Sequence, residues 1–432
     1  MSDSSGHRLT TLPSGVRVVT EAVPGVRSAA LGFFVATGSV TEPAEQAGWS
    51  HLLEHLLFRG TDRYGSAEID ELFDGMGAEL NAGTGRESTS IYSRVLDQHL
   101  ERAFDVIADM VWRPAITAPD VASEQEIVLE ELAMYEDDPQ DQVFDLLGEA
   151  TFGEHPLGRA VIGTRATVTA AGADGLHTFH DERYVPGDVV VAAAGSVDHD
   201  ALVALVAAQD VGPAGAHAPA PPAPPDGAAV PRRRFIEKAT EQVHLTLGAP
   251  GIARDDDRRY ALRVLDTVLG GTSSSRLFQE VREKRALAYS VSTFHAQYAG
   301  AGHVGLYLGT RPENLATAMQ VVGDELERFL QDGITADELV RAKENAQGRA
   351  VLTLESTSAR MNRLGGALLA GLPILSLDDL IARVDAVTAD DVLTLARDLL
   401  APERLSAAAI GPSEAAFRSA LEPVMPALAE AA

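Results

Sequence analysis

The sequence predicts an α+β protein built from two lobes of one fold. Residues 213–231, rich in proline and alanine, divide the 432-residue chain nearly in half and show no apolar periodicity, as expected for a solvated connector. Runs typical of strands and runs typical of helices occur on both sides of it. We therefore expect an N-terminal lobe over residues 1–212, this linker, and a C-terminal lobe over residues 232–432.

The two halves resemble each other in sequence. Ile116-Thr-Ala-Pro-Asp recurs as Ile334-Thr-Ala-Asp-Glu, and each copy is expected to open a long helix. A proline followed by a strand that ends in glycine occurs at 186–195 and again at 402–411. Such self-similarity indicates that the second lobe is a diverged copy of the first.

Composition narrows the class of protein. A hydrophobic content of 45% is that of a globular protein. The absence of cysteine excludes disulfides and thiolate chemistry, so any metal must be held by histidine and carboxylate groups. The polar N-terminus and the lack of an apolar run of ~18–20 residues predict a soluble, cytoplasmic protein. A net charge of −28 disfavours nucleic acid and anionic membranes and favours cationic partners.

The elements of the first half follow from local patterns. β-Branched and aromatic residues predict strands, and apolar periodicity between capping residues predicts helices. The expected strands are residues 16–22, 28–36, 78–82, 88–95 and 188–194. The expected helices are residues 47–60, 66–75, 97–112, a long helix from Thr117, one from about residue 166, and 199–208.

The stretch His51-Leu-Leu-Glu-His55 carries the chemistry. On a helix, His51 and His55 lie one turn apart on the same face and can offer two imidazoles to one metal. Glu54 then lies beside that metal, which is the inverted H-x-x-E-H arrangement of zinc peptidases. Two histidines can equally be half-buried residues of an amphipathic face. Five residues alone leave both interpretations open, because the site needs a third ligand.

The second half lacks these groups. Aligning Gly60 with Gly271 places Leu262, Leu265 and Asp266 opposite His51, Glu54 and His55. Aligning Ile116 with Ile334 places Arg349 opposite Glu131. We expect only the first lobe to bind metal.

Several motifs, in order along nearly the whole chain, resemble the pitrilysin/insulinase zinc metallopeptidases, specifically the short two-lobed type typified by the mitochondrial processing peptidase. The motifs are 48–61, 79–82, 124–138, 155–158 and 275–290. The resemblance implies that each lobe is a mainly antiparallel sheet flanked by helices, and that the lobes form a clamshell enclosing the substrate.

The resemblance also implies the roles of the site residues. Glu131, 76 residues after His55, would be the third ligand of one zinc ion per chain. Glu54 would be the catalytic acid–base residue, and Glu124 would steady the site from behind the ligands. The other glutamates of this helix are expected on a solvated face.

The resemblance implies substrate contacts as well. Arg282 and Tyr289 match a pair that holds substrate near the zinc, where Tyr289 can stabilise an oxyanion. Asn81 and Ala82 match an edge strand that pairs with an extended peptide. The family usually has glycine where this chain has Ala286, which puts the local backbone conformation in question.

The resulting hypothesis is a zinc-dependent endopeptidase acting on peptides or unfolded segments, with cationic peptides favoured. A homodimer is expected, and pairing with a related subunit is the other option. The alternative hypothesis is a non-catalytic scaffold or partner subunit of the same family, although such members typically lose ligand residues.

Overall fold

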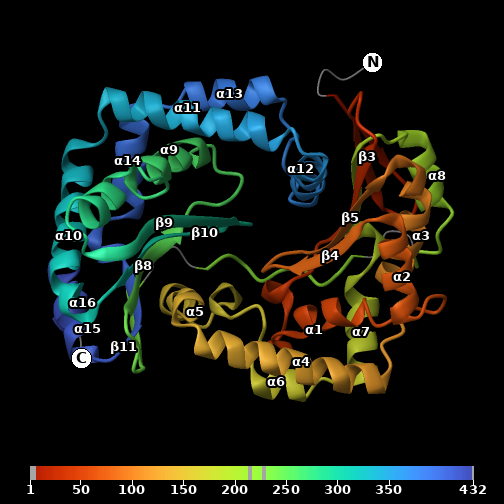
Figure 1. The fold of residues 1–432 in the computed structure, drawn as a ribbon, viewed down its shortest axis with the longest axis horizontal. Helices are drawn as coiled ribbons and strands as arrows, with labels where there is room; N and C mark the ends of the chain where they lie inside the picture. Colours follow the sequence, from red (N-terminus) through yellow and green to blue (C-terminus); the bar gives the residue numbers. More distant parts are fainter. Residues whose placement is uncertain (1–5, 213–216, 226–229, 431–432) are drawn as a thin grey trace. The chain divides into compact units, whose positions relative to one another are not determined.

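The computed structural model describes residues 6–212, 217–225 and 230–430. These residues form a mixed α+β structure with one six-stranded and one five-stranded sheet, each flanked by helices (Figure 1). The strands are β1 (His7–Thr11), β2 (Arg17–Ala22), β3 (Ser28–Val35), β4 (Glu79–Thr84), β5 (Thr89–Leu96), β6 (Val189–Gly195), β7 (Arg233–Glu237), β8 (Val243–Gly251), β9 (Ala288–Tyr298), β10 (Ala301–Thr310) and β11 (Ser406–Gly411).

The helices differ in length from five to twenty residues. They are α1 (Trp49–Leu56), α2 (Ser66–Met76), α3 (Leu100–Trp112), α4 (Ala118–Asp137), α5 (Pro139–Phe152), α6 (Arg165–Thr169), α7 (Ala173–Arg183), α8 (His199–Ala207), α9 (Arg259–Leu269), α10 (Leu315–Asp332), α11 (Ala336–Thr353), α12 (Thr357–Leu369), α13 (Leu377–Asp385), α14 (Ala389–Leu399), α15 (Glu414–Leu421) and α16 (Pro426–Glu430).

The two sheets share one topology. The strand order is β1-β2-β6-β3-β5-β4 in the first sheet and β7-β11-β8-β10-β9 in the second. The pairs β2–β6 and β7–β11 are parallel, and every other pair is antiparallel. The expected duplication into two mainly antiparallel sheets is therefore confirmed, with β1 as an addition that the sequence patterns did not predict.

The chain forms two compact units whose boundaries cross the two halves of the sequence. The first unit contains the residues up to Ala133, Ala160–Pro222 and Val351–Leu377, and the second contains the remainder. Segment 134–159 precedes the connector in the sequence but belongs to the second unit. Segment 351–377 follows the connector but belongs to the first unit. The predicted lobes, 1–212 and 232–432, omit these two exchanges.

Packing explains the exchange. One face of the first sheet is covered by helices such as α3, and α12 packs against the other face (Figure 1). Met361 and Leu364 of α12 are fully buried there. In the second unit, α5 packs against the sheet through the equally buried Val143 and Leu147. Each sheet would otherwise expose an apolar face, which is costly in water.

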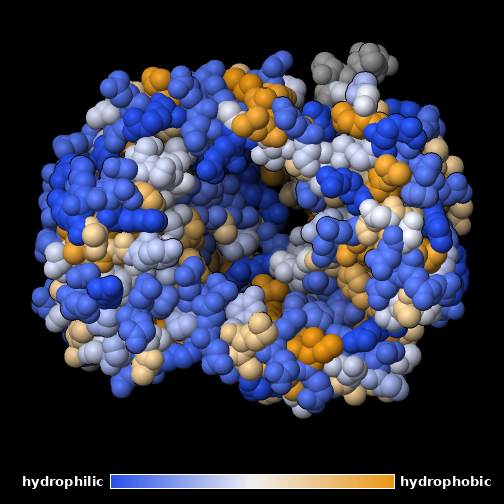
Figure 2. Space-filling view, in the orientation of Figure 1, coloured by the Kyte–Doolittle hydropathy of each residue, from blue (hydrophilic) through white to orange (hydrophobic). Residues whose placement is uncertain are grey.

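The predicted connector has no helix or strand in residues 217–225, whereas residues 213–216 and 226–229 lie outside the described residues. One boundary between the units falls inside it, after Pro222. Across the described parts of the chain, no helix has the length and apolar character needed to cross a bilayer. Hydrophilic residues cover most of the face seen in Figure 2, in keeping with the charge of −28.

Candidate metal centre

Helix α1 presents both motif histidines on one face. Its opposite face is anchored by Leu52, Leu53 and Leu56, which are fully buried in the core of the first unit. The rings of His51 and His55 lie with their centroids 4.7 Å apart. The apolar spacing that predicts the helix therefore also fixes the direction in which the two imidazoles point.

A buried carboxylate holds the start of α1. Glu42 accepts hydrogen bonds from the backbone N–H groups of Gly48, at 2.8 Å, and Ser50, at 2.7 Å. Gly48 has a φ of +88°, and a Cβ there would lie 2.4 Å from the carbonyl oxygen of Ile162. Only glycine fits this close approach, and Glu42 satisfies helix N–H groups that would otherwise lack partners.

The third predicted ligand comes from α4, which begins at Ala118 just after Ile116. Ile116 is buried and has a φ of +42°, an unusual conformation for a β-branched residue. Glu131 Oε2 lies 3.7 Å from Nε2 of His51 and 3.7 Å from Nε2 of His55. These residues form a group whose donor atoms all lie within 4.8 Å of one another.

This group fits a zinc ion. Tetrahedral zinc with bonds of about 2.0–2.1 Å spaces its ligand atoms by about 3.4 Å. The two distances from Glu131 Oε2 to the histidine nitrogens, 3.7 Å each, exceed that spacing by a few tenths of an ångström. Burial, reinforced by neighbouring His55, lowers the pKa of His51 to about 4. His51 is therefore neutral at pH 7, and one of its two ring nitrogens has a lone pair available to a metal.

Glu124 lies against the ring of His55. Its side chain is almost fully buried, and its Oε2 lies 2.9 Å from Nδ1 of His55. Its other oxygen, Oε1, accepts a hydrogen bond from Nε of Arg59. A carboxylate on the non-ligating nitrogen fixes the tautomer and ring orientation of a metal-binding histidine.

Glu54 lies beside the group and is held by the neighbouring strand. Thr84 Oγ1, at the end of β4, donates to Glu54 Oε2 at 2.5 Å. Burial raises the pKa of Glu54, and the hydrogen bond from Thr84 opposes that rise. Burial raises the pKa of the neighbouring Tyr184 hydroxyl, and the negative charge of Glu54 raises the Tyr184 pKa further. A carboxylate with a raised pKa suits a group that takes up and returns a proton.

A depression of about 380 Å³ adjoins Glu54 and His55 within the first unit. Phe58, Ile127, Asp70, Asn81 and Ala82 contribute to its lining. Strand β4, which carries Asn81 and Ala82, is an edge of its sheet, with no further strand beside it among the described residues. The two predicted peptide-pairing residues therefore lie on an open strand edge next to the metal group.

Arg282 and Tyr289 lie together in the second unit. The Arg282 guanidinium carbon is 5.4 Å from the centroid of the Tyr289 ring, and Tyr289 is 76% exposed. Both line an open depression, and Arg282 belongs to a π-helical segment, Phe278–Glu283. Ala286 has a φ of +50°, the left-handed conformation that glycine adopts most easily. The alanine thus keeps the backbone conformation that a glycine would have.

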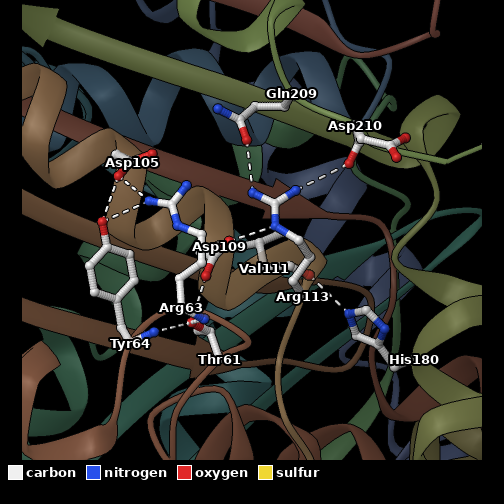
Figure 3. Close-up of polar contacts among 10 residues, drawn as sticks. All are labelled: Thr61, Arg63, Tyr64, Asp105, Asp109, Val111, Arg113, His180, Gln209 and Asp210. Carbon is white, nitrogen blue, oxygen red and sulfur yellow. Dashed lines mark hydrogen bonds and ion pairs between the residues drawn. The ribbon is translucent and has the colours of Figure 1, made fainter.

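A polar network pins the chain that leaves α1. Figure 3 shows Asp109, on α3, accepting from Thr61 Oγ1 and from Nε of Arg113, each at 2.5 Å. Asp109 is fully buried. His180 bonds the carbonyl of Val111 at 2.9 Å in the same region, which gives this histidine a structural role. The bond from Thr61 to Asp109 ties the chain after α1 to α3.

The structure therefore brings His51, His55, Glu131, Glu54 and Glu124 together within one unit. Sequence reasoning did not single out three supporting groups of this site. They are Arg59, Thr84 and Glu42. Arg59 lies inside the sequence motif 48–61, and Thr84 lies two residues after the motif 79–82. Glu42 lies outside every motif that the sequence analysis recognised.

Comparisons with known proteins show which family the chain resembles. A family model described as insulinase, peptidase family M16, matches residues 17–165, and one described as the peptidase M16 inactive domain matches residues 171–346. An uncharacterized zinc protease of Streptomyces coelicolor is 46% identical over 411 residues, covering 94% of this chain and 89% of that protein. The uncharacterized zinc protease YmxG of Bacillus subtilis is 40% identical over 408 residues, covering 93% and 98%.

Solved structures share the fold. The crystal structure of a protease from Helicobacter pylori matches with a TM-score of 0.88 at 21% identity, over 94% of this chain and 99% of that chain. A crystal structure described as a peptidase M16 inactive domain from Pseudomonas fluorescens matches with a TM-score of 0.86 at 24% identity, over 94% and 98%.

Proposed function

The chain belongs to the insulinase family of peptidases, M16, and we propose that it is a zinc-dependent endopeptidase acting on peptides or unfolded polypeptide segments. One observation carries the proposal. His51, His55 and Glu131 converge with their donor atoms within 4.8 Å, and the Glu54 carboxylate lies beside them. All four residues fall inside the match to the peptidase model, residues 17–165.

Each residue then has a chemical role. His51, His55 and Glu131 would hold one zinc ion, which would supply a Lewis acid and lower the pKa of a water molecule toward ~7. Glu54 accepts a proton from the attacking water and returns it to the leaving amine nitrogen. Thr84 keeps the Glu54 carboxylate aimed at that water, and Glu124 keeps the ring of His55 oriented.

The substrate is an extended chain. The free edge of β4 at Asn81 and Ala82 offers backbone N–H and C=O groups to a peptide strand, which gives affinity with little sequence preference. Arg282 and Tyr289, which lie together on the second unit, are proposed to contact the substrate.

Cationic side chains suit the depression beside Glu54. Phe58 and Ile127 give it apolar walls, and Asp70 is exposed at its edge. The charge of Glu124, also in the lining, is balanced by Arg59. A lysine or arginine next to the scissile bond would bury its aliphatic stem and place its charge near Asp70. Asp70→Asn should therefore reduce kcat/KM for a lysine-containing peptide more than for its norleucine analogue; an equal reduction would contradict this assignment.

The alternative is a non-catalytic partner subunit. It is favoured by the match of residues 171–346 to a model described as inactive, but that match begins after the whole metal group. Homodimerisation, or pairing with a related subunit, stays a prediction, which sedimentation velocity of the purified chain tests.

The decisive experiment compares two variants. Glu54→Gln should retain one zinc per chain by metal analysis and lose cleavage of a fluorogenic peptide library, because it removes only the proton acceptor. His51→Ala should lose zinc as well as cleavage. Normal cleavage by zinc-loaded Glu54→Gln would contradict the mechanism, and a purified wild-type protein that binds no zinc would favour the partner-subunit alternative.

A further inference from the structure

The carboxylate of Glu124 has both of its oxygens committed. Only 3% of the residue is exposed, its Oε2 faces Nδ1 of His55 at 2.9 Å, and its Oε1 accepts from Nε of Arg59. Arg59 is thus a cationic partner of a buried anion that touches a metal ligand. A buried carboxylate is stable as an anion only while it is paired in this way.

The backbone around Arg59 is fixed, so the position of its side chain is built into the fold. The N–H of Arg59 bonds the carbonyl of Leu56 at 3.1 Å, and the carbonyl of the next residue, Gly60, accepts from Ala115 at 3.0 Å. One residue further, Thr61 is held by the buried Asp109 (Figure 3). These bonds tie the chain after α1 to α3 and to the segment that leads into α4.

The two histidines differ in what orients them. His55 has Glu124 at its Nδ1. For His51, no hydrogen-bond partner of the buried Nδ1 is found among the described residues. Among the described residues, only His55 of the pair has a carboxylate on its non-ligating nitrogen, and that carboxylate is paired with Arg59.

We propose that Arg59 is a positioning residue that sets the zinc affinity of the site by clamping Glu124 against His55. The inference rests on the proposed zinc site. Without the guanidinium, the Glu124 carboxylate would turn toward water in the adjoining depression, and His55 would lose the acceptor that fixes its ring. Loss of such an outer partner typically weakens metal binding 10- to 100-fold.

If Arg59 acted only through its charge, its removal would change the zinc affinity in the opposite direction. Arg59 is a cation near the site of a divalent cation, so its removal would tighten zinc binding if charge repulsion dominated. The direction of the change in zinc affinity therefore separates the clamp from simple repulsion.

The test measures zinc dissociation constants of metal-free protein by competition with a chromogenic chelator. Arg59→Met, which keeps the length and removes the charge, should weaken zinc binding by about 10- to 100-fold. Arg59→Lys, which keeps a cation within reach of Glu124, should stay within about threefold of wild type. Glu124→Gln should show a loss similar to that of Arg59→Met.

The double variant Arg59→Met/Glu124→Gln provides the sharpest readout. Because Arg59 acts through Glu124, the double variant should bind zinc no more weakly than Glu124→Gln alone. Losses that multiply, or an Arg59→Met protein that binds zinc as tightly as wild type or more tightly, would overturn the inference. Matching thermal unfolding midpoints of the metal-free proteins establish that the variants are folded.

His51→Ala separates failure of this inference from failure of the proposed function. If wild type binds zinc and His51→Ala does not, the proposed metal site stands, and the Arg59 variants test the clamp alone. If His51→Ala binds zinc like wild type, the proposed site itself is wrong.

Discussion

Thr84 should be required for efficient catalysis although it is no metal ligand. It ends the edge strand β4, and its hydroxyl donates to Glu54 Oε2 at 2.5 Å. Thr84→Val removes this hydroxyl while keeping the branched shape of the side chain. The carboxylate of Glu54 would then be free to rotate away from the attacking water.

The size of the effect follows from the bond that is lost. A hydrogen bond to a charged group contributes about 1.5–3 kcal/mol. A tenfold change in rate corresponds to about 1.4 kcal/mol, so kcat should fall roughly 10- to 150-fold. KM and zinc content should change little, because Thr84 acts through Glu54. Thr84→Ser keeps the donor and should recover kcat to within about threefold of wild type.

The assay is steady-state hydrolysis of a quenched fluorescent peptide by zinc-loaded protein, with zinc measured in each sample. The reasoning would be refuted by a Thr84→Val protein whose kcat is within twofold of wild type. It would also fail if Thr84→Ser were as slow as Thr84→Val, because shape rather than the hydroxyl would then matter.

Three further predictions concern stability. Asp109→Ala should lower the free energy of unfolding by about 3 kcal/mol in urea titrations, because it leaves Arg113 without its buried partner; an unchanged midpoint would contradict this. Although burial opposes it, a hydrogen bond from Arg276 lowers the pKa of Glu338 to about 2. The stability from this pair should be present above pH ~4.5 and lost as the pH falls toward 2, and Glu338→Gln should flatten that part of the profile. Ala286→Gly should raise the thermal midpoint slightly, because it relieves a positive φ that costs alanine up to about 1–2 kcal/mol.

The elements that the sequence predicts best are those with a strong local pattern. The apolar runs of β3 and β6 are buried along almost their entire length, and both strands were expected within one or two residues. Helices α5 and α12 show why the unit boundaries were harder to predict. Their burial depends on which sheet lacks a cover, and that is a tertiary property that no local periodicity records.

The residues of the candidate site also differ in how far local sequence patterns pointed to them. Helical spacing alone placed His51 and His55 on one face of a short helix, but it left open whether they bind a metal. Glu131 required the resemblance, since 76 residues separate it from His55 and spacing gives no rule at that distance. Arg59 and Thr84 contact their partners across 65 and 30 positions in the chain, and arginine and threonine are common surface residues. Only the folded arrangement identifies them.

Both units have a hydrogen bond between an acidic residue on a helix and a threonine on the edge strand of the sheet. In the first unit, the helix after the third sheet strand is tied to the edge strand by the bond from Thr84 to Glu54. In the second unit, the equivalent helix α9 is tied to its edge strand β9 by Thr293, which donates to Asp266 Oδ1 at 2.6 Å. An acid on this helix bonded to a threonine on the edge strand therefore recurs without any metal group. The bond joins the helix to the edge strand in both units, but the two acids do not occupy equivalent positions, since the alignment of Gly60 with Gly271 places Leu265 opposite Glu54 and Asp266 opposite His55. The fold therefore favours an acid–threonine tie at this place, and the first unit differs in which residue of the helix supplies the acid.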